Sequence, residues 1–372
     1  MLDKNNKKIY QMLKISKSVL KAEKMMNKSL NYYREEILDE GAYILSNNIK
    51  EKLITFGVKN TNQIGKELVE VLRNNGFLFH TLDKMSHGGR AIDVDLINPL
   101  TGKVMTGSSS GSCVNILLGI NDFALGTDGG GSVIGPAMST NLYGIMAKGL
   151  GLKGSENKIS TDNIIFTSGI GVISHNYNLC VDVIKSLVPI NVYHNEELED
   201  KNIKIAIPKK NSIILPTGKD IREELEDTIN QLKNTVEFIE KDFSKIYNRK
   251  DAISLCEEIF SEGIDMIMTL EGPVDLLGIG DSVLGNLGHV GRILQDNSGK
   301  YLLKVANMIN STSVTIPINE LGMGILLIGK EGLESGSIAI SLGNIIKDKI
   351  FLSSLFERYF INSYLREEQG YI

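Results

Sequence analysis

The chain has 372 residues, of which 42 % are hydrophobic and 23 % charged, so its composition is typical of a globular protein that can bury a large core. Its net charge of −5 argues against the broad basic surface that non-specific nucleic-acid binding requires. No stretch of about 18 uncharged apolar residues occurs, so the sequence predicts no membrane-spanning helix.

The first predicted elements are helical. Residues 4–40 carry apolar side chains at helical spacing, among them Leu13 and Val19, and predict amphipathic helices. We expect these helices to pack on the body of the protein; binding to a partner is the alternative. We therefore divide the chain into an N-terminal helical segment, residues 1–40, and one domain, residues 41–372.

A strand, a helix and a second strand are predicted next. Ala42–Ser46 has the pattern of a short apolar strand, Lys66–Asn74 that of a helix, and Phe77–Leu82 that of another strand. Two strands joined through a helix are expected to pair in parallel, because such a crossover returns the chain to the same edge of the sheet.

The remaining sequence alternates helical and strand patterns, with neither repeats nor a linker, and predicts a single α/β domain. The helices are expected at Cys113–Leu118, Asn176–Leu187, Ile221–Leu232 and Ser335–Lys347. The strands are expected at Ile203–Ile207, Val236–Ile239, Met266–Thr269, Ser313–Pro317 and Gly324–Gly329. The glycine-rich stretch Gly278–Gly299 is expected to be loop.

The most informative segment is Thr106–Pro136, in which two clusters of glycine and serine flank an apolar helix and a short strand. Glycines allow several successive backbone N–H groups to converge on one point, and such a nest binds an anion. A serine at the end of a nest can attack a carbonyl carbon while the nest stabilises the developing oxyanion.

Other interpretations of these glycines fit less well. A P-loop needs Lys-Ser or Lys-Thr after its glycines, and neither pair follows here. A Rossmann turn needs G-x-G-x-x-G directly after a strand, a spacing that Gly129–Gly131 lacks. A purely structural turn explains one glycine cluster better than it explains two, whose serines Ser108 and Ser132 are 24 residues apart.

The segment resembles the motifs of the amidase-signature family, G-G-S-S-G-G-S followed by an apolar helix and G-T-D-x-G-G-S. The corresponding stretches here are T-G-S-S-S-G-S, residues 106–112, and G-T-D-G-G-G-S, residues 126–132. The resemblance extends over nearly the whole chain. It implies the fold of that family, a single α/β domain with a mixed central sheet flanked by helices.

The same resemblance implies roles for individual residues. Ser132 corresponds to the nucleophile, and Ser108 to a bridging serine whose preceding peptide bond is cis. Gly129, Gly130 and Gly131 correspond to the glycines whose backbone N–H groups bind the oxyanion.

The general base is where the sequence departs from the family. Members keep a lysine at the end of a strand of the V-K-D-N-I type, and we match that strand to residues 44–49. Ser46 then takes the place of the lysine, or Asn47 does if the register shifts by one residue. A serine is a poor nucleophile without an adjacent base, so this match predicts a shortened family member that lacks the catalytic lysine.

Three residues are candidates for a replacement base. Lys84 follows the strand Phe77–Leu82, at the edge of the sheet where active sites of parallel sheets cluster, and is our first choice. Lys50 lies in the loop after the matched strand, and His87 lies close to Lys84 in sequence. Each of them is alternatively an ordinary solvated or structural side chain.

Two functions therefore remain open. The first is an amidase-type enzyme that hydrolyses or transfers the acyl group of a non-peptide or small-molecule C–N bond through an acyl-Ser132 intermediate. The second is a catalytically impaired relative that binds an amide, an acyl group or a partner protein. The sequence contains no metal or nucleotide motif, so we expect no cofactor and no metal.

The partners and the compartment follow from the same features. A small-molecule amide or acyl substrate is expected, with neither nucleic acid nor membrane; a homodimer or a pathway partner stays open. The three cysteines are widely spaced and form no disulfide framework, and the N-terminus lacks the apolar core of a signal peptide. We therefore expect a soluble, cytoplasmic protein.

Overall fold

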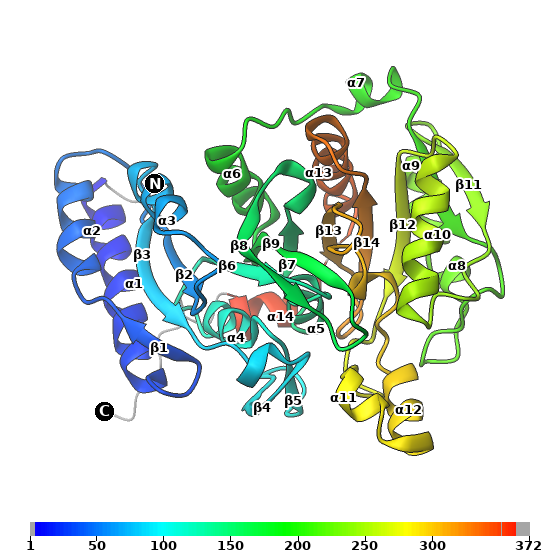
Figure 1. The fold of residues 1–372 in the computed structure, drawn as a ribbon. Coiled ribbons are helices and arrows are strands. Elements are labelled where there is room, and N and C mark those ends of the chain that lie inside the picture. The colour runs from blue at the N-terminus through cyan, green and yellow to red at the C-terminus, as the bar shows by residue number, and fades with distance from the viewer. Residues whose placement is uncertain (1–3, 351, 362–372) are drawn as a thin grey trace.

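The computed structural model describes residues 4–350 and 352–361, and a 12-stranded mixed sheet runs through it (Figure 1). The strands lie in the order β1-β3-β2-β6-β9-β7-β13-β14-β12-β10-β11, with β8 paired to β9. Their bounds are β1 Leu30–Tyr33, β2 Thr55–Lys59, β3 Leu78–Asp83, β6 Phe123–Asp128, β7 Tyr143–Met146, β8 Lys153–Ile159, β9 Ile165–Ser174, β10 Lys204–Pro208, β11 Glu237–Lys241, β12 Met266–Glu271, β13 Thr312–Pro317 and β14 Gly324–Gly329. A separate small sheet pairs β4, Ile92–Ile97, with β5, Val104–Thr106. The expected α/β fold with a mixed central sheet is confirmed.

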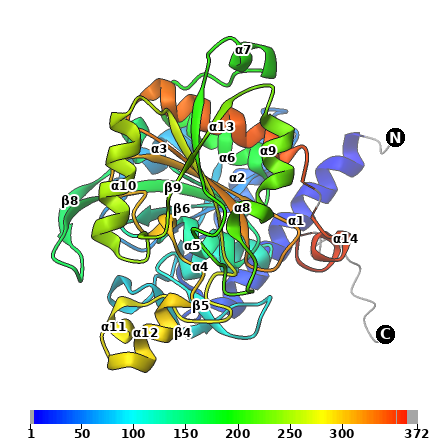
Figure 2. The same ribbon diagram turned by 90° about the vertical axis from the view of Figure 1, so that its right-hand side faces the viewer.

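Helices cover both faces and both ends of this sheet. Their bounds are α1 Lys4–Met25, α2 Ile37–Ser46, α3 Lys66–Asn74, α4 Ser110–Leu117, α5 Ile134–Ser139, α6 Tyr177–Leu187, α7 Asn195–Glu199, α8 Ile221–Glu224, α9 Glu226–Leu232, α10 Arg249–Ser261, α11 Ser282–Gly285, α12 Gly288–Asp296, α13 Leu333–Lys347 and α14 Ser354–Phe356. In Figure 2, α6 and α13 lie on one side of the sheet and α4 and α5 on the other. No described helix combines the length and the apolar character needed to cross a bilayer.

The predicted strand–helix–strand unit is present, but its first strand was assigned wrongly. Ala42–Ser46 belongs to helix α2, and the strand that pairs in parallel with β3 is β2. The apolar residues Ile37, Gly41 and Leu45 recur every four positions, and all three are buried. A strand would place every second side chain inside, so this spacing fits a helix.

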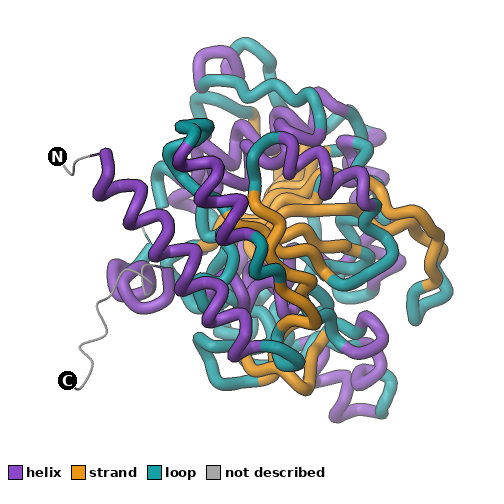
Figure 3. The backbone as a smooth tube through the Cα atoms, turned by 90° about the vertical axis from the view of Figure 1, so that its left-hand side faces the viewer, coloured by secondary structure: helices purple, strands orange, loops and turns teal. Residues whose placement is uncertain are grey.

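The N-terminal helix packs against α2 at one end of the molecule (Figure 3). Ile15 and Val19 of α1 are buried in a small cluster with Ile37 and Leu45 of α2. Leu13 lies on the opposite side of α1 and is 55 % exposed. The strand that follows, β1, joins the central sheet as an antiparallel neighbour of β3.

Most of the other predicted elements are confirmed within a few residues, with two differences. The stretch Ile221–Leu232 is divided at Leu225 into the short helices α8 and α9. The stretch Gly278–Gly299 is not only loop, because it contains α11 and α12, which project from the body below the sheet (Figure 1).

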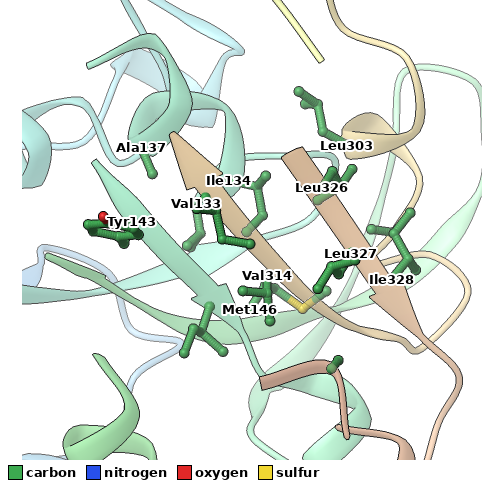
Figure 4. Packing of buried hydrophobic residues seen from close by; sticks show 14 of the residues in the cluster. Val133, Ile134, Ala137, Tyr143, Met146, Leu303, Val314, Leu326, Leu327 and Ile328 are labelled. Carbon is green, nitrogen blue, oxygen red and sulfur yellow. The ribbon is translucent and has the colours of Figure 1, made fainter. Parts of the chain in front are cut away.

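The central core lies directly behind the second glycine cluster. Val133 and Ile134, which follow Ser132, are buried in it beside Val314, Leu326 and Leu327 of β13 and β14 (Figure 4). Because close-packed side chains cannot move freely, this packing fixes the start of α5 and with it the loop that carries Ser132.

Candidate active site

The loop between β6 and α5 is folded around one buried carboxylate. Asp128 accepts hydrogen bonds from the backbone N–H groups of Gly131 at 2.7 Å, Val133 at 2.6 Å and Ile134 at 3.3 Å. Gly131 has φ of 96°, a left-handed conformation that side chains with a Cβ rarely adopt. The loop therefore needs glycine there, and it leaves Ser132 half-buried at its turn.

Asn307 holds the same loop from the other side. Its amide Nδ2 donates to the carbonyl of Gly129 at 3.3 Å and to that of Thr167 at 3.1 Å, and its Oδ1 accepts from the Gly169 N–H at 2.7 Å. In a trans peptide the N–H points opposite to the C=O. Fixing the Gly129 carbonyl on Asn307 thus directs the Gly130 N–H to the opposite side of that peptide.

The first serine cluster lies against the second. The Gly107–Ser108 peptide bond is cis, and α4 begins two residues later. The Ser109 N–H donates to the Ser132 carbonyl at 3.2 Å, which ties the two loops together. Ser108 is 4 % exposed and lines the same cavity as Ser132.

A lysine is in direct contact with this serine. Lys59 is the last residue of β2, and its Nζ lies 2.7 Å from Ser108 Oγ and 3.0 Å from the carbonyl oxygen of Thr127. Its side chain is buried, with 2 % of the residue exposed. Burial lowers the pKa of Lys59 to about 7; the nearby Asp128 carboxylate opposes this shift and Lys158 adds to it. A large fraction of the Lys59 side chains is therefore neutral near pH 7.

The prediction that the strand-end lysine is replaced by Ser46 is wrong. Ser46 ends helix α2 and is exposed, with its hydroxyl bonded to the carbonyl of Tyr43 at 3.1 Å. Asn47, the alternative, also donates to that carbonyl. Strand β2 ends in Val58 and Lys59, which have the V-K order of the motif.

The replacement bases that the sequence suggested bond elsewhere. Lys84 forms ion pairs with Asp93 at 3.3 Å and with Asp95 at 3.4 Å. Lys50 donates to the carbonyl of Asn75 and lies over the ring of Phe77. His87 is exposed in a short 3-10 turn, η1, His87–Gly89.

The three glycines expected to bind the oxyanion have different surroundings. The Gly131 N–H donates to Asp128 at 2.7 Å. Gly129 and Gly130 line the cavity together with Ser132. The Gly130 N–H is the one that the Asn307 contact orients.

These residues form part of the wall of a cavity of about 310 Å³. Lys59, Ser108, Ser132 and the two glycines share it with Arg90, Phe166, Arg249, Asp281 and Met308. Arg90 Nε and Asp281 Oδ2 are 3.0 Å apart, so an ion pair joins the loop before β4 to the start of α11. Within the described residues, no group of three or more His, Cys, Asp or Glu side chains could hold a metal ion. Cys113, Cys180 and Cys256 are buried free thiols.

A sequence model of the amidase family matches residues 67–272, which is more than half of the chain. The chain belongs to the amidase family. A curated relative, Amidase 1 of rice (Oryza sativa subsp. japonica), is 38 % identical over 89 residues, a match that covers 24 % of this chain and 20 % of the relative. The chain thus spans only about a fifth of the length of that curated relative.

Solved structures agree with this family at the level of fold. The peptide amidase of Stenotrophomonas maltophilia superposes with a TM-score of 0.64 at 14 % identity, covering 91 % of this chain and 93 % of that one. An allophanate hydrolase of Kluyveromyces lactis gives 0.61 at 15 % identity, covering 93 % and 72 %. At such low identity the likeness concerns the fold alone.

The position of Lys59 relative to the family match bears on why the sequence did not identify it as a candidate base. Lys59 lies before residue 67, outside the part of this chain that matches the family model. A signal was nevertheless present. Six residues separate Lys59 from helix α3, a normal strand-to-helix connection, whereas nineteen separate Ser46 from it.

Proposed function

We propose that this amidase-family chain hydrolyses a small-molecule amide through an acyl-Ser132 intermediate, with Lys59 as the general base. The observation that carries the proposal is the contact of 2.7 Å between the buried Lys59 Nζ and Ser108 Oγ. A base must lie within hydrogen-bond reach of the proton that it accepts, and Lys59 meets this requirement for Ser108.

The first half of the reaction acylates the enzyme. Neutral Lys59 accepts the hydroxyl proton of Ser108, Ser108 accepts that of Ser132, and Ser132 Oγ forms a bond to the amide carbon. The negative charge on the carbonyl oxygen is stabilised by the backbone N–H groups of Gly130 and its neighbour Gly129. The C–N bond then breaks, and the leaving nitrogen takes up the proton that Lys59 returns through Ser108.

The second half releases the acyl group. A water molecule transfers a proton along the same path to Lys59 and attacks the acyl carbon. The ester bond to Ser132 breaks, and Ser132 regains its proton. The products are a carboxylic acid and an amine, and the enzyme returns to its starting state. The cavity of about 310 Å³ is within the range of small-ligand pockets, which favours a small-molecule substrate.

The alternative function, a protein that only binds an amide, an acyl group or a partner, rested on the missing base. The contact between Lys59 and Ser108 removes the observation on which that alternative depended. Lys84, our first candidate for the base, is placed by the proposal in a supporting role, as the ion-pair partner of Asp93.

Labelling with a fluorophosphonate, which reacts with activated serines, tests this proposal. The native protein should be labelled at Ser132, and Ser132→Ala should not be labelled. Lys59→Met should slow labelling by roughly 10²–10⁴, the usual contribution of general-base assistance.

Lys84→Arg is the matched control, because arginine keeps the ion pairs with Asp93 and Asp95 but cannot act as a base. It should be labelled at the native rate. The proposal fails if the native protein is not labelled at Ser132, if Lys59→Met reacts as fast as the native protein, or if Lys84→Arg loses the reaction.

A further inference from the structure

Arg249 is a charged residue of the cavity wall that the proposed mechanism does not use. It is the first residue of α10, and its side chain is 18 % exposed. A Cβ atom added to Gly130 would lie 3.7 Å from Arg249 Nη2. The guanidinium therefore lies close to Gly130, whose backbone N–H would bind the oxyanion. A short substituent on the substrate could reach from that N–H to the guanidinium.

The bonds that Arg249 makes leave part of its donor capacity unused. Its Nη1 forms an ion pair with Asp162, in the turn between β8 and β9. Its Nε is buried and has no hydrogen-bond partner among the described residues. A guanidinium has five N–H donors, so a ligand can bind to Arg249 while the ion pair with Asp162 remains.

Positive charge is concentrated around this residue although the whole chain carries a net charge of −5. A second cavity of about 540 Å³ shares Arg249 and Ser282 with the catalytic cavity. Besides Lys59, the described cationic residues that line these two cavities are Arg90, Lys158, Arg249, Lys250, Arg292 and Lys304. The described carboxylates that line them are Asp162, Asp281 and Asp296. A cleft whose walls carry mainly one sign of charge attracts ligands of the opposite sign.

We propose that Arg249 is a specificity-determining residue, and that the substrate is an amide carrying an anionic group, such as a carboxylate, which Arg249 binds. This inference rests on the proposed function, because it places the anionic group on the molecule that Ser132 attacks. The planar guanidinium suits a carboxylate, to which it can donate two parallel hydrogen bonds.

The alternative is that Arg249 has only a structural role, as the ion-pair partner of Asp162. Such a role would require neither the proximity of Nη2 to Gly130 nor the surplus of cations in the two cavities. It also makes a different prediction, because loss of a purely structural arginine would weaken the binding of charged and neutral ligands alike.

The test measures binding and does not depend on catalysis. Calorimetry on Ser132→Ala would compare succinamate with succinamide and glutaramate with glutaramide, pairs that have equal length and differ in one negative charge. We expect at least one anion to bind roughly tenfold or more tightly than its neutral partner. Adding Arg249→Met should remove this preference and leave the affinity for the neutral amide within about twofold, and Arg249→Lys should keep part of the preference.

Lys245→Met is the control for net charge, because Lys245 is an exposed cation four residues away that lines neither cavity. It should keep the native preference. The inference is wrong if both members of every pair bind equally or undetectably, or if the preference survives Arg249→Met. If the anion binds more tightly than the neutral amide but Ser132 is not labelled by the fluorophosphonate, the anion site is supported and the proposed reaction is contradicted. If Ser132 is labelled but the anion binds no more tightly, the proposed reaction is supported and the anion site is contradicted.

Discussion

Asn307 is the residue whose hydrogen bonds orient the Gly129–Gly130 peptide, so its removal should affect the reaction more than the fold. Asn307→Ala deletes the donor to the Gly129 carbonyl and frees that peptide to rotate. Because loss of one oxyanion donor costs about 10²–10³ in rate, we expect the labelling of Ser132 to slow by about 10²-fold. Comparing labelling rates with thermal melting of the same samples checks this prediction.

Asn141 provides a matched control. Its Nδ2 donates to the carbonyls of Ile318 and Glu320, and its Oδ1 accepts from the Gly322 N–H at 2.8 Å, the same pattern of bonds that Asn307 makes. Asn141→Ala should lower the melting temperature and leave the labelling rate within about twofold. Equal slowing in both variants would mean that Asn307 acts only through overall stability.

At this scale the sequence located the two serine clusters and missed the lysine. The glycine-rich clusters can be recognised in the sequence, because their conformations admit few other residue types. Gly131 has a left-handed conformation, and Gly129 occupies a narrow space beside Phe166. Lys59 has no such local mark. Its distinguishing property, burial against Ser108, arises from residues 49 positions apart and is visible only in the folded chain.

Among the elements, the hairpin of α11 and α12 depends on a close approach of two backbones. A Cβ atom added to Gly291 of α12 would lie 2.0 Å from the carbonyl oxygen of Leu284 in α11. Gly291→Ala should therefore force the helices apart and lower the free energy of unfolding by about 1–3 kcal/mol, the usual cost of overpacking. Asp281 and Ser282 at the start of α11 line the cavity, so the apparent affinity with which the cavity binds the fluorophosphonate before it reacts with Ser132 should also change.

The exposed residue Val290 lies in the same helix and is 70 % exposed, so Val290→Ala is the control that should alter neither property by a measurable amount. Denaturant unfolding and the concentration dependence of labelling check both variants. Native behaviour of Gly291→Ala would show that the two helices do not need this contact.

The same hairpin shows why composition alone misled at the level of elements. Gly278–Gly299 is rich in glycine, which is unfavourable within helices, and a loop was the natural expectation. Gly291 is instead required for helix-to-helix contact, because a Cβ atom there would meet the backbone of Leu284; local propensity does not contain this tertiary reason. The strand predicted at Ala42–Ser46 was wrong for a different reason. Five apolar-rich residues taken alone fit a strand or a buried helix, and the helical spacing becomes visible only when Ile37 and Gly41 are included.

Over the whole molecule, the sheet brings together residues that are far apart in the chain. Lys59 ends β2, the loop with Ser132 follows β6, and these two strands are parallel neighbours, so their carboxyl ends meet at one edge. Asn307 reaches the same loop from the segment before β13. The α/β class could be predicted because helical and strand patterns alternate along the chain, and the mixed central sheet was expected from the resemblance to the amidase-signature family. The cavity could not, because single side chains from several loops form it.

The central claim is that Lys59, with a pKa of about 7, activates Ser132 through Ser108, and the pH dependence of labelling tests it most directly. Lys59 is protonated and inactive as a base below this pKa and neutral above it, so the rate should rise with pH, with its midpoint near 7 and a plateau by about pH 9. Lys84→Arg should show the same curve, and Lys59→Met should lose it. A rate that is constant between about pH 5 and 9, or a curve that persists in Lys59→Met, would contradict the account.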